Sequence, residues 1–147
     1  MSAIGIDYGA VRIGVARELD GTGIVVPLAT VTPEAFETKF IDWLSEFEVS
    51  EVYVGLPTSL SGEAGSQAQQ VQQWAAALAT KYSNLSWYWV DERLTSVMAE
   101  RMLSNIGKSS REQRKIVDAQ AAIFILEQAI AIRDGQGGSN AKPIDKT

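Results

Sequence analysis

The sequence predicts an α/β fold in which helices cover both faces of a mixed five-stranded sheet. Three short β-rich runs follow one another over residues 3–31 with only turns between them, which is typical of an antiparallel meander. From residue 32 onward, runs with helical spacing alternate with β-rich runs, and strands joined through a helix pair in parallel. The predicted order is therefore β-β-β-α-β-α-β-α-α, with two parallel strands added to the meander.

The meander begins with AIGIDYG, residues 3–9, where Gly9 closes a tight turn. Its hairpin partner is VRIGVARE, residues 11–18, and the third strand is GIVVPLATV, residues 23–31. Pro27 lies inside the third run. Because proline has no N–H to donate to a ladder, this run is expected to be an edge strand or to contain a bulge.

Thr32 and Pro33 mark the start of the first helix, with a hydroxyl cap and a proline at the first helical position. The apolar residues that recur at helical spacing after them are Phe36, Phe40, Leu44 and Phe47. A buried strand over residues 51–57 and a long helix over about residues 64–82 follow.

The last part of the chain adds a strand, SWYWVDER at residues 86–93, and a short helix capped by Thr95. Ser109-x-x-Glu112 is a capping-box pattern that precedes an apolar helix ending near Arg133. The segment after it has no periodicity. One domain over residues 1–133 and a flexible tail over residues 134–147 are therefore expected.

The chain has 147 residues and contains neither cysteine nor histidine. These absences exclude thiol nucleophiles, disulfides, Cys/His zinc sites and His-based catalytic triads. Any chemistry must therefore use carboxylates, hydroxyls, amines or a hard metal ion bound by oxygen.

The formal net charge is −5, but it is unevenly distributed along the chain. Residues 1–92 carry a net charge of −8, whereas residues 93–147 carry +3. A local positive field can attract a polyanion to an acidic protein, so a nucleic-acid partner remains open. No apolar run has the length of a membrane span and no secretory leader pattern is present, so a cytoplasmic protein without membrane contact is expected.

Acidic residues occur at three places where a carboxylate is unusual. Asp7 ends an apolar strand, Asp91 and Glu92 end another, and Asp118 lies in an alanine-rich part of the last helix. Taken singly, Asp7 can initiate a turn and the Asp91–Glu92 pair can form a polar strand end, but a charge among alanines needs a partner. Carboxylates that converge repel one another unless a cation lies between them, and oxygen ligands alone select Mg²⁺ or Mn²⁺.

Basic residues gather mainly just before Asp118. The candidates for contact with phosphate groups are Arg12, Arg17, Arg93, Lys108, Arg111, Arg114 and Lys115, with the Ser109 hydroxyl beside them. Alone, the last four basic residues are typical of a solvated helix start. Beside a metal site they would form a rim that positions a nucleic-acid backbone without reading its sequence. The four tryptophans are expected in the core rather than in contact with bases.

Four blocks of the sequence resemble the signature blocks of the YqgF family, which is described as Holliday-junction-resolvase-like. They are GIDYGAVRIGVA, VGLPTSLSG, DERLTS and VDAQAAIFIL, they occur in the family's order, and the resemblance spans residues 3 to about 130. The resemblance implies an RNase H-like fold and a metal-dependent endonuclease that matures the 5′ end of precursor 16S ribosomal RNA. A resolvase acting on branched DNA, and a non-catalytic RNA- or ribosome-precursor-binding factor, are the alternatives.

The same resemblance implies Asp7, Glu92 and Asp118 as catalytic metal ligands, with Asp91 as a further candidate. The resolvase itself has a second aspartate three residues after the helix one, and here that position is Ala121. This departure weakens the analogy with junction resolution. The implied partners are precursor rRNA, branched DNA and ribosomal precursor particles, and the chain itself is expected to be a monomer or a weak homodimer.

Overall fold

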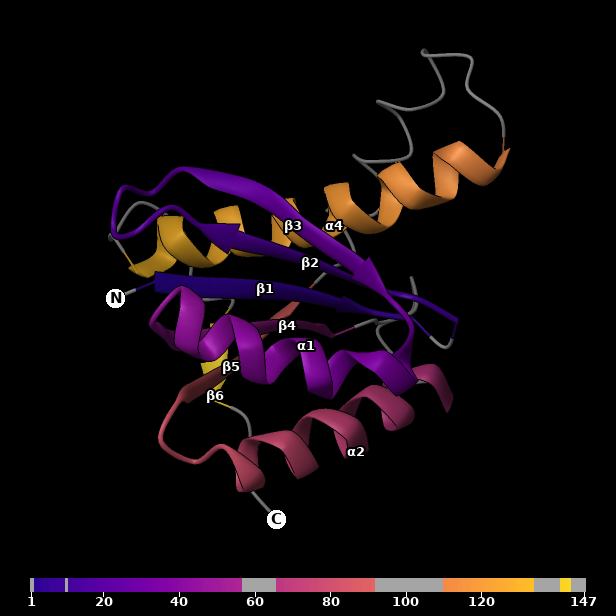
Figure 1. Cartoon of the computed structure of the whole chain (residues 1–147). Coiled ribbons are helices and arrows are strands. Elements are labelled where there is room, and N and C mark those ends of the chain that lie inside the picture. The colour runs from indigo at the N-terminus through magenta and orange to yellow at the C-terminus, as the bar shows by residue number, and fades with distance from the viewer. Residues whose placement is uncertain (1, 10, 57–65, 92–109, 134–140, 144–147) are drawn as a thin grey trace.

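Six strands form one mixed sheet in the order β3-β2-β1-β4-β5-β6, with helices on both faces (Figure 1). The computed structural model describes residues 2–9, 11–56, 66–91, 110–133 and 141–143. The elements along the chain are β1 (Ser2–Tyr8), β2 (Ile13–Glu18), β3 (Val25–Val31), α1 (Pro33–Glu46), β4 (Val49–Leu56), α2 (Ser66–Lys81), β5 (Ser86–Asp91), α4 (Ser110–Arg133) and β6 (Ala141–Pro143). The predicted α/β class and mixed sheet are confirmed.

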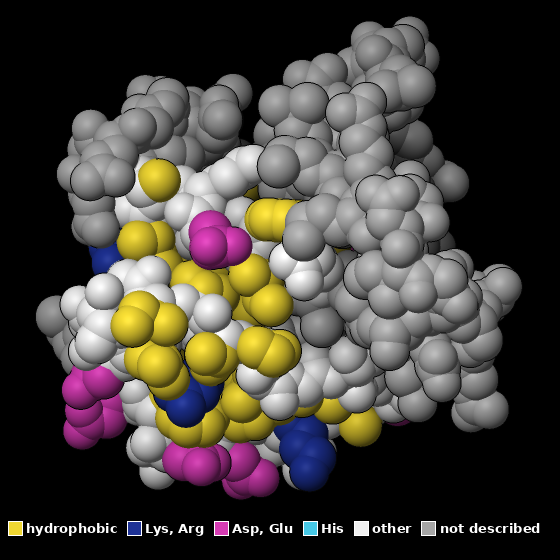
Figure 2. Space-filling view, turned by 90° about the horizontal axis from the view of Figure 1, so that it is seen from above, with side chains coloured by type: hydrophobic (Ala, Val, Ile, Leu, Met, Phe, Trp, Pro, Cys, Tyr) yellow, Lys and Arg dark blue, Asp and Glu magenta, His cyan; other side chains and the backbone are white. Residues whose placement is uncertain are grey.

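Strands β1, β2 and β3 form the predicted antiparallel meander, and β3 lies at the edge of the sheet. The ladder between β2 and β3 passes from the pair Val15–Ala29 to the pair Ala16–Pro27, so one residue of β3 is left over. Pro27 thus lies at a bulge in an edge strand, which satisfies both positions open to a proline. On the face seen from above, Figure 2 shows hydrophobic side chains gathered together, with charged side chains mostly around them.

Helices α1 and α2 cover one face of the sheet, and the larger hydrophobic core lies beneath them. The Thr32 hydroxyl accepts a hydrogen bond from the Ala35 N–H at 3.3 Å, so α1 begins with the predicted cap. Phe36 and Phe40 are fully buried beside Ile4 and Ile6 of β1. The tryptophans belong to this core as expected, buried at positions 43 and 87 and half-buried at 74 and 89.

Helix α4 covers the opposite face alone among the described helices, and its contact surface is made of small and aliphatic residues. The buried side chains that form this second core are Ala3, Ala16, Tyr53, Val90, Ala122, Ile125, Leu126, Ala129 and Ile130. Small residues on both sides let the helix backbone come close to the strands. None of the described helices is long and apolar enough to span a membrane.

The sheet differs from the prediction at its far edge. Three residues of the segment expected to be a flexible tail form β6, which pairs antiparallel with β5 through Tyr88–Pro143, Trp89–Lys142 and Val90–Ala141. The five predicted strands are therefore present together with a sixth. The short helix predicted after Thr95 lies outside the described residues.

Candidate active site

Asp7 lies next to the end of β1, half-buried, and pairs with Gly14 of β2. Side chains alternate along β1: Ile4 and Ile6 belong to the core under α1 and α2, whereas Ala3 belongs to the core under α4. This alternation places Asp7 on the α4 face of the sheet. The next residue, Tyr8, packs on the other face, with its ring centroid 4.7 Å from that of Trp74.

The second acidic position, Asp91, ends β5 at the same edge of the sheet. Strands β1, β4 and β5 are parallel, so their carboxyl ends meet there. Ile6 is level with Val54 of β4, and Asp91 is level with Leu56, so the backbone of Asp91 is displaced from that of Asp7 by one residue along the strands. With β4 between them, the two positions are separated by two strand spacings, about 10 Å.

Helix α4 comes close to β1 at Gly5. A Cβ atom at Gly5 would lie 2.7 Å from Leu126 Cβ and 2.9 Å from the Ala122 carbonyl oxygen, so no larger residue fits without movement of the helix. The last residue of the helix, Arg133, donates a hydrogen bond to Glu18 of β2, and the Glu18 side chain also lies against the backbone of Ala3, at the start of β1. Because the end of the helix therefore lies near the start of the strand, α4 runs antiparallel to β1.

This orientation gives the level of the third acidic position. Asp118 precedes the centre of the Gly5 contact, near residue 124, by six residues, about 9 Å along the helix, and Asp7 follows Gly5 by two residues, about 6.6 Å along the strand. The two steps lead in the same direction and differ by less than one helical turn. The backbone at position 118 of α4 therefore lies within one helical turn of the level of Asp7.

Several predicted site residues lie beyond what the structure describes. Glu92, Arg93, Lys108 and Ser109 are outside the described residues. The positions whose backbone is described but whose side chains are not are Asp91, Arg111, Arg114, Lys115 and Asp118. The three basic ones occupy the first turns of α4, on the N-terminal side of position 118.

The two arginines of the meander that were predicted to contact phosphate groups lie near opposite ends of β1. Arg12 is half-buried in the connection between β1 and β2, close to Asp7 in the chain. Arg17 pairs with Ile4, near the opposite end of β1, and its guanidinium carbon lies 4.1 Å from the centre of the Phe47 ring. Arg17, which the sequence names as a candidate for phosphate contact, is therefore not brought together with Asp7, because it lies on the α1 face and stacks on an aromatic ring.

An ion pair with one buried partner joins β2 to the end of α4, and the sequence did not predict it. Glu18 is fully buried, and both its carboxylate oxygens accept hydrogen bonds from Arg133, at 3.0 and 2.8 Å. Its Oε2 also accepts from the Gly23 N–H at 3.0 Å. These partners are 115 residues apart in the chain, and no local pattern marks either of them.

The hydrogen bonds from Arg133, and after them those from backbone N–H groups, hold the pKa of Glu18 below its ordinary value of 4.5, against the opposing effect of burial. A lowered pKa in the folded state means that Glu18 stabilises the fold above the pKa of the unfolded chain. That stability is lost as pH falls through the folded-state pKa. We expect Glu18→Gln to lower the free energy of unfolding at about pH 7, and to lower it progressively less as the pH falls through the folded-state pKa, where the wild-type carboxyl becomes protonated too. Urea denaturation over a series of pH values from neutral to acid measures the difference, and a loss that is the same at every pH would contradict the assignment.

The described side chains contain no group of three carboxylates able to hold a metal ion. The fit of a metal therefore rests on donor chemistry and backbone placement. Asp7 and position 118 lie within one helical turn of the same level across the α4 interface, Asp91 ends β5 at the same edge, two strand spacings away, and the chain offers no nitrogen or sulfur ligand from histidine or cysteine. An oxygen-only donor set suits Mg²⁺ or Mn²⁺.

The sequence matches a family model described as "RuvX: Holliday junction resolvase" over residues 1–132. Similar proteins named "Putative pre-16S rRNA nuclease" occur in several bacteria. One from Crocosphaera subtropica is 42% identical over 132 residues, which cover 87% of this chain and 91% of the relative. One from Nocardioides sp. is 36% identical over 150 residues, which cover 98% and 96%.

The fold is shared with RuvC of Thermus thermophilus. A structure of that protein in complex with a Holliday junction substrate aligns with a TM-score of 0.56 and 18% identity, covering 97% of this chain and 99% of RuvC. A second RuvC structure aligns with a TM-score of 0.53 and 19% identity over the same shares. At these identities the likeness concerns the fold, and it confirms the RNase H-like architecture. Together with the family model and the relatives, it confirms the resemblance found in the motifs: the chain belongs to the RuvX family.

Proposed function

We propose that this protein is a metal-dependent endonuclease that processes the 5′ end of precursor 16S ribosomal RNA. The observation that carries the proposal is the meeting of three acidic positions at one edge of an RNase H-like sheet. Asp7 lies on the α4 face of β1, position 118 of α4 lies within one helical turn of its level, and β5, two strand spacings away, ends in Asp91, which Glu92 follows in the sequence.

Of the two acidic residues Asp91, which ends β5, and Glu92, which follows it, we propose Glu92 as the ligand. Tyr88 and Val90 belong to the core under α4, whereas Trp87 and Trp89 belong to the core under α1 and α2. If this alternation continued past Asp91, the next position to face α4 would be 92. Asp91 follows the other alternation, and its carboxylate is proposed to have at most an indirect effect on the site.

Asp7, Glu92 and Asp118 would hold one or two Mg²⁺ or Mn²⁺ ions. Such an ion, when bound, would activate water against a phosphodiester and stabilise the charge that develops on the leaving oxygen. The protein's part is to hold the carboxylates still. Asp7 does so from a strand paired on both sides, and Asp118 from a helix that contacts Gly5 directly. The chain has no histidine to act as a base near neutral pH, which agrees with a reaction that needs no protein base.

Ala121 favours RNA processing over junction resolution as the activity of this chain. The resemblance implies a second helix aspartate at this position in the resolvase, and here the position is occupied by Ala121, which has no carboxylate and is 1% exposed. Relatives named as pre-16S rRNA nucleases support the same choice. The proposed place of action is on ribosomal precursor particles in the cytoplasm. A monomer would be sufficient, because the RNA is cut once.

A direct assay separates the substrates. Purified protein with Mn²⁺ is expected to cleave an RNA that carries the 16S leader faster than a four-way DNA junction of equal length. Faster cleavage of the junction would favour the resolvase, which the family's description suggests. Binding of the leader without cleavage at any Mn²⁺ concentration would favour a non-catalytic RNA-binding factor.

The start of α4 is proposed as the rim that holds the RNA backbone. Because Arg111 and Arg114 precede position 118 by two turns and one turn, reversing both to glutamate should weaken RNA binding and reduce its salt dependence. The slope of log K against log salt should fall by roughly 1.4, at about 0.7 for each lost single-strand phosphate contact. Lys39→Glu, on the exposed surface of α1, is the matched control and should change the slope little. Equal slopes in the wild type and the double variant would exclude the rim.

A further inference from the structure

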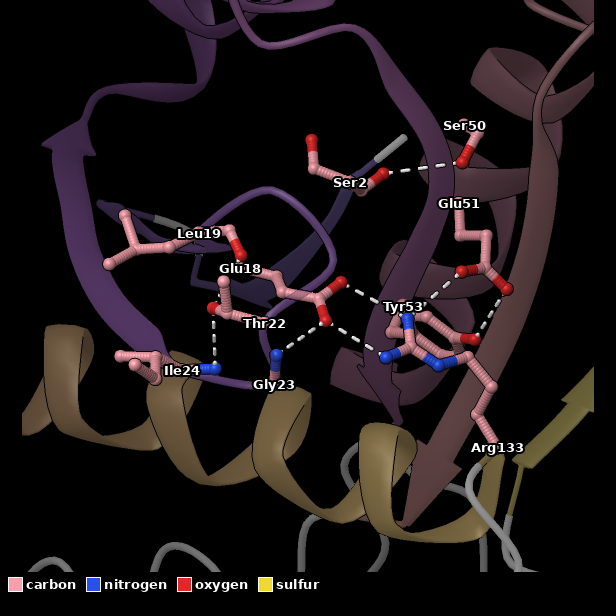
Figure 3. A network of polar contacts seen from close by, with 10 residues as sticks. All are labelled: Ser2, Glu18, Leu19, Thr22, Gly23, Ile24, Ser50, Glu51, Tyr53 and Arg133. Carbon is pink, nitrogen blue, oxygen red and sulfur yellow. Dashed lines mark hydrogen bonds and ion pairs between the residues drawn. The ribbon is translucent and has the colours of Figure 1, made fainter.

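The C-terminal end of α4 is tied to the sheet by three charged residues, Glu18 of β2, Glu51 of β4 and Arg133 (Figure 3). We call them the α4 clamp. The Arg133 guanidinium donates to Glu18 through both Nη atoms, and its Nη1 also lies 3.4 Å from Glu51 Oε1. The two carboxylates belong to strands on opposite sides of β1, so one guanidinium spans three strands.

The geometry of the clamp restricts the helix in two directions. A bidentate guanidinium–carboxylate pair fixes orientation as well as distance. Glu18 is itself immobilised, because it is fully buried and accepts a further hydrogen bond from the Gly23 N–H. Glu51 is held in turn by the Tyr53 hydroxyl, which donates to its Oε2 at 3.0 Å. The end of α4 is thereby held both along its axis and across the sheet.

Helix α4 has a second point of attachment at Gly5, which Ala122 and Leu126 contact. Taking residue 124 as the centre of that contact, Arg133 lies nine residues, about 14 Å, to one side of it, and Asp118 lies six residues, about 9 Å, to the other. A helix of this length behaves as a stiff rod. If the clamp released its end by 1.5 Å, pivoting at Gly5 would move position 118 by about 1 Å, an error that can cost about 100-fold in rate.

We propose that the α4 clamp is a positioning device that sets where Asp118 stands relative to Asp7. Glu18, Glu51 and Arg133 do not touch the substrate or the metal; they act through the helix. The inference rests on the proposed function only in taking Asp118 as a metal ligand.

The variant for the test must remove the clamp without unfolding the protein. Removing one partner would leave Glu18 buried and unpaired, whereas replacing both by apolar residues of similar volume is often neutral for stability. We therefore choose Glu18→Leu with Arg133→Met. The control is Glu37→Leu with Lys81→Met, which removes an ion pair that links α1 to α2 and lies apart from α4.

Two readouts decide the matter, neither of which is nuclease activity. Crystal structures superposed on the sheet should show position 118 of α4 displaced by about 1 Å in the clamp variant and in place in the control. Mn²⁺ titration by electron paramagnetic resonance should show about a 10-fold weaker Kd in the clamp variant, approaching that of Asp118→Asn, with no change in the control. Arg133→Lys keeps the positive charge but loses the two parallel hydrogen bonds of the guanidinium, so its Kd for Mn²⁺ should lie between those of the wild type and the clamp variant.

An unmoved α4, or a displaced α4 with unchanged Mn²⁺ affinity, overturns the positioning role. Equal Mn²⁺ affinity in the wild type and Asp118→Asn has a different meaning. It overturns the assignment of Asp118 as a ligand, and with it the metal site of the proposed function.

Discussion

Asp7→Asn is expected to lower RNA cleavage by on the order of 10³-fold, equivalent to about 4 kcal/mol in the activation barrier, while RNA binding persists. The amide keeps the size of the carboxylate but loses the charge that would hold a divalent cation. The side chain is half-buried in a strand with neighbours on both sides, so the substitution should leave the backbone in place.

Single-turnover cleavage and a filter-binding assay, performed on the same RNA, measure the two quantities separately. Asp42→Asn, an identical change on the exposed surface of α1, is the control and should cleave like the wild type. Cleavage by Asp7→Asn within a factor of ten of the wild type would remove Asp7 from the metal site.

Gly5→Ala is expected to damage both the stability and the activity of the protein. The added methyl group would meet Leu126 Cβ at 2.7 Å and the Ala122 carbonyl oxygen at 2.9 Å, and because one of these atoms belongs to the helix backbone, α4 must move. Overpacking of this kind costs about 2 kcal/mol, which corresponds to a fall in Tm of roughly 6 °C. Displacement of Asp118 with the helix should lower kcat by at least about 10-fold.

Thermal unfolding and single-turnover kinetics test the two effects. Gly21→Ala makes the same chemical change in the turn between β2 and β3, where no atom lies within 4 Å of the added carbon and the φ angle is +69°. It should cost about 1 kcal/mol through backbone strain and leave kcat unchanged. If Gly5→Ala and Gly21→Ala have the same Tm and the same kcat, the close contact between α4 and β1 contributes nothing specific to stability or activity.

The elements that could be predicted from the sequence are those whose signal is local. Thr32 and Pro33 indicate a helix start, because a hydroxyl can cap the first turn and proline fits the first helical position. The spacing of Phe36 and Phe40 indicates the buried face of the same helix. Pro27 indicated an edge or a bulge because it lacks an N–H, and the structure shows both.

The elements that escaped prediction depend on partners distant in the chain. β6 is three residues long and includes Pro143, so it has neither the length nor the pattern of a strand until β5 is beside it. The separation of Arg17 from Asp7 could not be predicted, because it depends on the alternation along β2 and on the Phe47 ring. The Glu18–Arg133 pair exists only once β2 and the end of α4 meet.

For the site, the acidic residues could be named from the sequence, but their convergence could not. Asp7 is visible as a charge at the end of an apolar strand, yet its level relative to position 118 follows from the contact at Gly5 and the antiparallel course of α4. The preference for Glu92 over Asp91 likewise needs the assignment of Val90 and Trp89 to opposite cores.

The most direct test of the account is a crystal of the wild-type protein soaked in Mn²⁺ and measured at a wavelength where manganese scatters anomalously. The account predicts one or two anomalous peaks, from Mn²⁺ ions bound by Asp7, Glu92 and Asp118. It also predicts that these peaks are lost in a crystal of Asp7→Asn treated in the same way. No peak among these three carboxylates at saturating Mn²⁺, or a peak that persists in Asp7→Asn, would contradict it.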